Sequence, residues 1–422
     1  MVNYSFGLVS ECDFRPSLDA RFKTGETVSA SYLSRSRTIA QSAANEQLCA
    51  STDNGNQLQG CSRRDAIRQL LCLGTLASLA KGALGAQAPQ AIGRIDLHHH
   101  FFAPTSLLKR FMATAPAQGP IVGYTAARAL ETMDQAGVAT AMLSCPVPFG
   151  DNPASVRADA RALAREMNEF GARMVAEHKG RFGLFAVLPM ADVDDALREI
   201  EYVFDTLRAD GVGLLTSYGR QWLGDDGFDA VFHELNRRRA VVYSHPVDAP
   251  CCHNLLPKTG PQVVEYNTDT SRAIWNVIND GTNPATGLPM VAGDVVSPTP
   301  SRATQYSDIT FIWSHAGGSL LGLVGRFLGA GARPESLGRT PPVNSRLHHL
   351  RRFYYDTAGS TNPIQMQSLK SLVGASQIVF GSDYPFAPPA ATVEGLRNAG
   401  FSAEELRAIE RENPLRAVPR KS

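Results

Sequence analysis

The chain has 422 residues, of which 43% are hydrophobic, enough for one large globular domain or two average ones. Its 41 basic and 40 acidic residues balance to a net charge of +1, so the surface as a whole lacks the positive field that attracts nucleic acid. The seven cysteines show no C-x-x-C spacing, and we expect no structural disulfide. Composition therefore excludes polyanion binding by the surface as a whole, and the cysteine spacing predicts no disulfide scaffold.

Residues 61–88 have the pattern of an export signal. The paired arginines Arg63-Arg64 precede the apolar run Leu70–Ala80, and the segment ends at Ala86-Gln87-Ala88, an A-x-A cleavage pattern. This order is typical of a twin-arginine signal, a route for proteins that are exported already folded. An amphipathic helix that covers the following domain is the alternative.

The preceding residues, 1–60, are rich in Ser, Asn, Gln and Ala and have no extended apolar period. We expect either a disordered leader or an initiator assigned upstream of the true start. With the signal, the protein is expected to be periplasmic or exported; without it, cytoplasmic. No other segment has the ~18 apolar residues of a membrane span, so we expect no membrane association of the mature form.

From 91 to 420, short β-rich runs alternate with amphipathic segments. Helical periodicity is clear in Arg157–Lys179 and in Asp194–Arg208, for which Asp192 is a plausible N-cap. An open, doubly wound sheet needs a Gly-rich first turn, whereas the first strand here runs into histidines. The pattern therefore predicts an α/β fold, a (β/α)₈ TIM barrel. The expected strands are Ile92–Leu97, Val138–Leu143, Gly183–Leu188, Val212–Thr216, Ala240–Ser244, Ile309–Ser314, Phe353–Thr357 and Gln377–Ser382.

Two segments interrupt this alternation. Pro246–Gln262 follows the fifth strand, so we expect it over the barrel mouth as a lid. Thr282–Tyr306 is rich in Pro, Gly and Thr and precedes the sixth strand. We expect this second segment at the opposite face, as a structural excursion.

Polar side chains end several of the strands, where parallel barrels carry their chemistry. His98 and His100 are two residues apart on one strand, so both can face the barrel axis while His99 points outward. His245 and Asp383 end the fifth and eighth strands. Each histidine alone would more often be a hydrogen-bonded core residue. Together, three imidazoles and one carboxylate predict a site for one divalent metal ion at the C-terminal face, Zn²⁺ first and Mn²⁺ as the alternative.

His315 ends the sixth strand and precedes Gly317-Gly318. We expect it to act as a catalytic acid or base rather than as a ligand, since imidazole titrates near neutrality. Binuclear barrel hydrolases bridge two ions with a lysine at the end of strand four, but no lysine occurs between Lys179 and Lys258. A mononuclear site is therefore expected.

These motifs resemble those of the amidohydrolase-superfamily decarboxylases, the group that includes aminocarboxymuconate semialdehyde decarboxylase and the 6-methylsalicylate decarboxylases. The resemblance spans roughly residues 92–415 and rests on strand-end motifs around Asp96–His100, Ser244–Pro246, Ser314–Gly318 and Gly381–Pro385. It implies that His98, His100, His245 and Asp383 are metal ligands and that His315 is catalytic. Arg326 matches an arginine that binds substrate in a neighbouring subunit's site, which implies a homodimer.

The resemblance also implies a reaction. We expect metal-dependent, non-oxidative decarboxylation of a small aromatic or unsaturated carboxylic acid, such as the ortho-hydroxybenzoate 6-methylsalicylate, with His315 or Asp383 as the proton donor. A mononuclear metal-dependent hydrolase of a lactone or amide is the alternative from a different class. A binding protein without activity is a third reading, disfavoured because all five polar site residues are present.

Overall fold

The computed structural model describes residues 93–104, 119–146, 154–253, 255–283, 286, 291–292, 294–295 and 299–419. The expected leader (1–60) and export segment (61–88) lie outside the described residues. Among the helices of the described part, none combines the length and the apolar character needed to cross a membrane.

Eight parallel strands form one sheet whose spatial order is the order along the chain. Each strand pairs with the next in parallel, as expected when a helix connects consecutive strands. This confirms the predicted α/β architecture. The strands are β1 (Arg94–His100), β2 (Val138–Ser144), β3 (Phe182–Val187), β4 (Gly211–Leu215), β7 (Val241–His245), β10 (Thr310–Trp313), β11 (Tyr354–Asp356) and β12 (Ile378–Val379).

The first and last strands meet and nearly close the barrel. Beyond the short β12, the chain continues alongside β1. The N–H of Leu97 donates to the carbonyl of Phe380 at 2.9 Å, and the N–H of His100 donates to the carbonyl of Tyr384 at 2.7 Å. A parallel bridge also joins His99 to Tyr384. The segment that follows β12 is thereby held against β1, the strand that carries His98 and His100.

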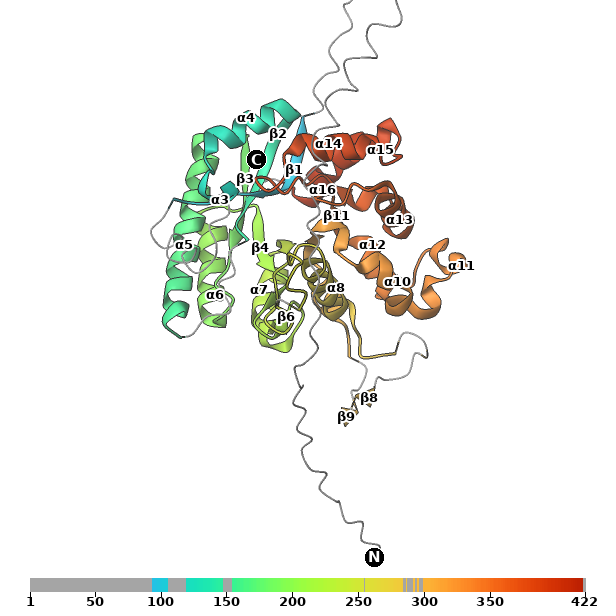
Figure 1. The fold of residues 1–422 in the computed structure, drawn as a ribbon. Helices are drawn as coiled ribbons and strands as arrows, with labels where there is room; N and C mark the ends of the chain where they lie inside the picture. The colour runs from blue at the N-terminus through green and yellow to red at the C-terminus, as the bar shows by residue number, and fades with distance from the viewer. Residues whose placement is uncertain are drawn as a thin grey trace, which may run out of the picture. The chain divides into compact units, whose positions relative to one another are not determined.

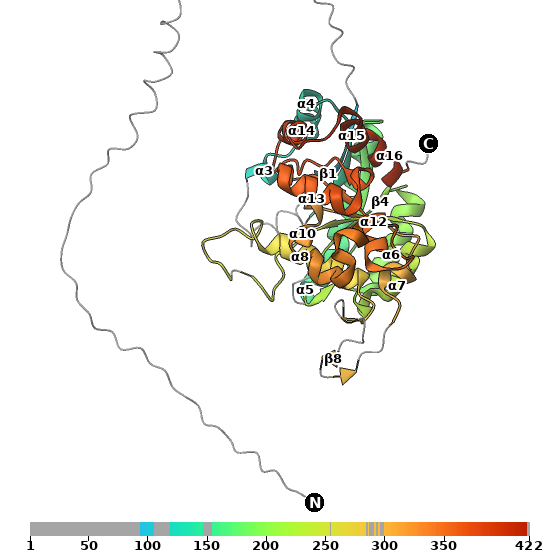
Figure 2. The same ribbon diagram turned by 90° about the vertical axis from the view of Figure 1, so that its right-hand side faces the viewer.

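Helices surround this sheet in both views (Figures 1 and 2). Asp192 is an N-cap as expected, since its side chain accepts a hydrogen bond from the N–H of Asp195 at 3.0 Å. The helix predicted for Asp194–Arg208 changes after Glu201 into a π-helical turn, Tyr202–Thr206. The helices are α3 (Gly119–Val122), α4 (Ala126–Ala136), α5 (Ala154–Glu177), α6 (Val193–Glu201), α7 (Asp229–Arg237), α8 (Glu265–Ile278), α9 (Arg302–Gln305), α10 (Leu320–Leu328), α11 (Pro334–Leu337), α12 (Arg346–Arg352), α13 (Pro363–Val373), α14 (Pro389–Arg397), α15 (Ala403–Arg407) and α16 (Asn413–Ala417).

The two segments that interrupt the strand–helix alternation lie on either side of α8, between β7 and β10. Pro246–Gln262 leaves the carboxyl end of β7, and its role as a lid stays a prediction. Thr282–Tyr306 contains a small hairpin, β8 (Val291–Ala292) with β9 (Asp294–Val295), and the helix α9. Another hairpin, β5 (Ser217–Tyr218) with β6 (Gln221–Trp222), follows β4.

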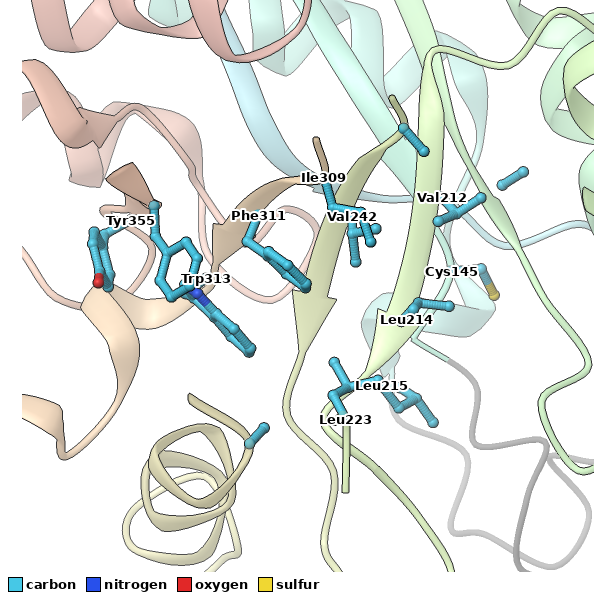
Figure 3. Close-up of a cluster of buried hydrophobic side chains, with 14 of the residues drawn as sticks. Cys145, Val212, Leu214, Leu215, Leu223, Val242, Ile309, Phe311, Trp313 and Tyr355 are labelled. Carbon is cyan, nitrogen blue, oxygen red and sulfur yellow. The ribbon is translucent and has the colours of Figure 1, made fainter. Parts of the chain in front are cut away.

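Alternate residues of the strands face two separate apolar clusters. Inside the barrel, Phe185, Tyr243 and Ile312 pack in a cluster to which Ala417 and Val418 also belong. The intervening residues, such as Leu214, Val242 and Trp313, belong to the cluster that packs against the helices (Figure 3). This alternation decides which strand-end side chains face the barrel mouth.

A β-bulge in β1 changes the phase of this alternation. Asp96 pairs with Ala141 and His99 with Leu143, so three steps along β1 match two along β2. Leu97 can therefore belong to the interior cluster while the next residue, His98, also lies inside. The bulge brings the histidine pair to the mouth above a filled apolar core.

Candidate metal centre

Four side chains from three strand ends converge at the carboxyl end of the barrel: His98, His100, His245 and Asp383. One possible ligand atom from each lies within 4.8 Å of all the others. The Nε2 atoms of His98 and His100 are 3.0 Å apart. Asp383 Oδ1 lies 3.1 Å from Nε2 of His100 and 3.2 Å from Nε2 of His98. The structure thus brings together all four residues that the sequence suggested as ligands.

The other ring nitrogen of each histidine already has a partner. His98 Nδ1 lies 2.8 Å from Asp356 Oδ2, and His245 Nδ1 lies 2.8 Å from the carbonyl oxygen of Pro246. Because these oxygens only accept, both Nδ1 atoms carry the proton and both Nε2 atoms present a lone pair. His100 Nδ1 pairs with Ser144 Oγ at 3.0 Å. Converging lone pairs and a carboxylate suit a divalent cation between them.

The electrostatics of these buried groups also favour a cation. Burial opposes the charged form of His98, but Asp356 and Asp383 outweigh it and raise its pKa to about 10. Burial lowers the pKa of His100 to about 4 and that of His245 well below its ordinary value. Burial opposes ionisation of Asp383, yet His98 and His100 hold its pKa well below the ordinary value. Two carboxylates therefore favour a positive charge at this point. A metal ion would supply that charge and leave His98 neutral, with its Nε2 lone pair available as a ligand.

Asp356 is the main residue that sequence reasoning missed. It is fully buried at the end of β11. Besides its contact with His98, its Oδ1 accepts hydrogen bonds from the backbone N–H groups of His315 at 2.9 Å and Ala358 at 3.0 Å. A carboxylate at the end of the seventh strand was the available signal, but its partners lie far away in the sequence.

Asp96 is a second buried carboxylate with a positioning role. Its Oδ1 accepts from the N–H groups of His98 at 3.1 Å and Ser382 at 3.0 Å. Its Oδ2 accepts from the Ser382 hydroxyl at 2.5 Å and lies 3.2 Å from Nδ1 of His99. His99 therefore points away from the metal group, and its ring stacks on Tyr384 at 4.6 Å. Asp96 joins the bulge of β1 to the segment that carries Asp383.

His315 lies beside the four-residue group without belonging to it. Its ring centroid is 4.9 Å from that of His98 and 5.9 Å from that of His245. Its Nδ1 donates to the carbonyl of Ala358 at 2.9 Å, which leaves Nε2 free to exchange a proton. His315 and Ala316 both have positive φ, of 51° and 57°, a strained conformation that is common at functional sites.

Arg326 lies on α10 and is exposed. Within the described ranges of the chain it forms no hydrogen bond or ion pair, and it is not part of the four-residue group. Its predicted role needs a neighbouring subunit and stays a prediction.

Comparison with known proteins identifies the family. The amidohydrolase family model matches residues 95–420. The chain belongs to the amidohydrolase family. This family member is 33% identical over 345 residues to decarboxylase yanB of Aspergillus niger, covering 78% of this chain and 88% of that protein. It is 32% identical over 308 residues to 6-methylsalicylic acid decarboxylase of Penicillium expansum, covering 70% and 86% of the two chains.

The fold of this amidohydrolase is similar to a solved structure of dihydroxybenzoic acid decarboxylase from Polaromonas, with bound manganese and the inhibitor 2-nitroresorcinol. The TM-score is 0.62 at 20% identity, covering 78% of this chain and 97% of that chain. The similarity confirms the barrel fold.

Proposed function

We propose that this amidohydrolase is a carboxy-lyase that catalyses metal-dependent, non-oxidative decarboxylation of a small aromatic carboxylic acid. The observation that carries the proposal is the convergence of three imidazoles and one carboxylate beside His315, in a chain whose relatives are named decarboxylases. The substrate class that we propose is an ortho-hydroxybenzoate, with 6-methylsalicylate as its first member, after the name of the Penicillium expansum relative.

We propose His98, His100, His245 and Asp383 as the ligands of one divalent ion. The nitrogen-rich donor set supports Zn²⁺, and Mn²⁺ is the alternative, since it is the ion bound in the Polaromonas structure. When bound, such an ion supplies a positive charge that orients the carboxylate and the adjacent hydroxyl and stabilises negative charge that develops on them.

The protein's own residues must deliver one proton to the ring carbon that bears the carboxylate. We assign this proton to Nε2 of His315 in its protonated form. The Ala358 carbonyl accepts from Nδ1, so the second ring proton is on Nε2, and the contact fixes the direction of the ring. Asp383, which is 21% exposed, is the alternative donor, and it would have to take up a proton from water before it could donate. Protonation of the carbon interrupts the aromatic system. Cleavage of the carbon–carbon bond then returns its electron pair to the ring and releases carbon dioxide, and the donor regains its proton from water.

We also propose that the active assembly is a homodimer in which Arg326 binds substrate in the neighbouring subunit's site. Its exposure on α10, free of partners among the described residues, supports this role. The substitution Arg326→Ala should raise KM without changing the mass in solution. A monomeric active enzyme would contradict the shared site.

Product analysis tests the function. The purified, metal-loaded protein is incubated with salicylate, 6-methylsalicylate and dihydroxybenzoates, and carbon dioxide and the phenol are both quantified. We expect equimolar carbon dioxide and phenol from at least one substrate. Lactones and amides are assayed in parallel. Hydrolysis of one of these, with no carbon dioxide from any benzoate, would overturn the proposal in favour of a hydrolase.

A further inference from the structure

A small cavity lies at the inner wall of the barrel mouth, directly beside the candidate metal centre. Its lining comes from the ends of β2, β4 and β7 and includes Ser144, Cys145, Gly213, Leu215, Tyr243 and His245. His245 belongs to the four-residue group, and Ser144 holds Nδ1 of His100 at 3.0 Å. A molecule bound at the centre can therefore extend into this cavity.

The walls of the cavity are mainly apolar. Cys145, Leu214 and Leu215 supply most of the apolar lining. Strand β4, Gly211–Leu215, carries no charged residue, so the cavity has no charged side chain from that strand. An apolar space with a polar edge suits a ring substituent better than a second ion.

Gly213 creates the space on the β4 side. It is partly accessible, whereas the other four residues of the strand are buried. The free volume of the cavity is about 10 Å³, roughly enough for one water molecule, and a methyl group is only slightly larger than a water molecule. A larger substituent would need the walls to move.

We propose that this cavity is the subsite for one methyl-sized, apolar ring substituent of the aromatic acid, and that Gly213 determines how large that substituent can be. This inference rests on the proposed decarboxylase function and adds the feature of the substrate that the enzyme selects. The carboxylate and hydroxyl of the substrate face the metal centre, and the substituent fills the space between β2 and β4.

The substitution Gly213→Ala is a gentle probe of this subsite. A Cβ atom at Gly213 would lie 3.6 Å from the Phe185 carbonyl oxygen, 3.7 Å from Phe185 Cβ and 3.9 Å from Ser144 Cβ, all ordinary van der Waals distances. The variant should fold and narrow the cavity by one carbon atom. Gly325→Ala is the matched control, because a Cβ at this exposed position of α10 meets nothing within 4 Å.

The test is the ratio of kcat/KM for a methylated salicylate to kcat/KM for salicylate, measured for the four ring-methyl isomers. In the wild type we expect kcat/KM for one methyl isomer to be roughly 10- to 100-fold higher than for salicylate, the discrimination that burial of one methyl group provides. Gly213→Ala should lower that ratio by roughly 10-fold or more, with unchanged metal content, and Gly325→Ala should retain it. If Gly213→Ala leaves this ratio of kcat/KM values unchanged, the proposed subsite is wrong.

A second variant narrows the cavity from the opposite wall. Cys145 is buried at the end of β2, and Cys145→Val adds about one methyl group of volume there. Cys145→Val should lower the same ratio of kcat/KM values. If Gly213→Ala does not fold, this variant alone tests the proposed subsite. Absence of carbon dioxide release by the wild type from every salicylate would instead reject the proposed function, so the two failures are distinguishable.

Discussion

The carboxylate of Asp356 lies 2.8 Å from Nδ1 of His98, and neither side chain is exposed to solvent. The same carboxylate accepts the backbone N–H of His315 through its other oxygen. One buried group therefore orients both a proposed metal ligand and the proposed proton donor. Metal-ligating histidines commonly donate their second N–H to such a carboxylate, which fixes the tautomer and raises ligand basicity.

Replacing Asp356 by asparagine should weaken metal binding by roughly 10- to 100-fold, the usual effect of losing such a partner. An asparagine can keep the contact with the His315 N–H but removes the negative charge beside His98. Affinity is measured by competition with a chromophoric chelator. Asp308→Asn, at an exposed position, is the control. Equal affinities in the two variants would show that Asp356 does not support the centre.

Replacing His315 by alanine should reduce kcat by roughly 10² to 10⁴, the contribution of a positioned acid or base, while metal content stays near one ion per chain. The reason is that His315 lies beside the four converging groups but is not one of them. His233→Ala, on the exposed face of α7, controls for loss of a histidine. Full activity of His315→Ala would transfer the proton-donor role to Asp383.

Gly381 should not tolerate a side chain. A Cβ there would lie 2.8 Å from His98 Cβ and 2.9 Å from Asp356 Cβ, closer than packed carbon atoms approach. We expect Gly381→Ala to lower the free energy of unfolding by about 1–3 kcal/mol, as overpacking does, and to weaken metal binding. Urea unfolding and metal content, compared with Gly325→Ala, measure both effects. Wild-type values for both would mean that the space around His98 is looser than the structure indicates.

The free energy of unfolding should decrease as the pH is lowered from 6.5 towards 4, because of His349. Burial, together with the nearby charge of Arg352, lowers the pKa of this imidazole from the ordinary 6.5 to about 4. Between these values the unfolded chain binds a proton that the folded chain does not, so stability is complete above pH 6.5 and is lost as the pH falls towards 4. The loss by pH 5 is roughly 2 kcal/mol.

The substitution His349→Gln should flatten this part of the pH profile, whatever its effect on stability at neutral pH. Its side chain can replace the contact that Nε2 of His349 makes with Thr304 Oγ1 at 2.9 Å. The free energy of unfolding in urea, measured from pH 7 to pH 5, provides the comparison. Parallel profiles for the variant and the wild type would rule out His349 as the source.

Much of the architecture could be read from the sequence because each barrel strand is a short apolar run that ends in a polar residue. The order of the eight strands and the convergence of His98, His245 and Asp383 follow from that pattern alone. Alternation could not reveal the bulge in β1, because an extra residue leaves no compositional trace. Nor could it show Asp356 beside His98, a contact across 258 residues that depends on the closure of the barrel.

The most direct test of the account is carbon dioxide release from 6-methylsalicylate by the same preparation before and after metal removal. We predict that chelation abolishes release and that adding back one equivalent of Zn²⁺ or Mn²⁺ restores it with equimolar phenol. Release that continues at the original rate in the metal-free protein would contradict the account.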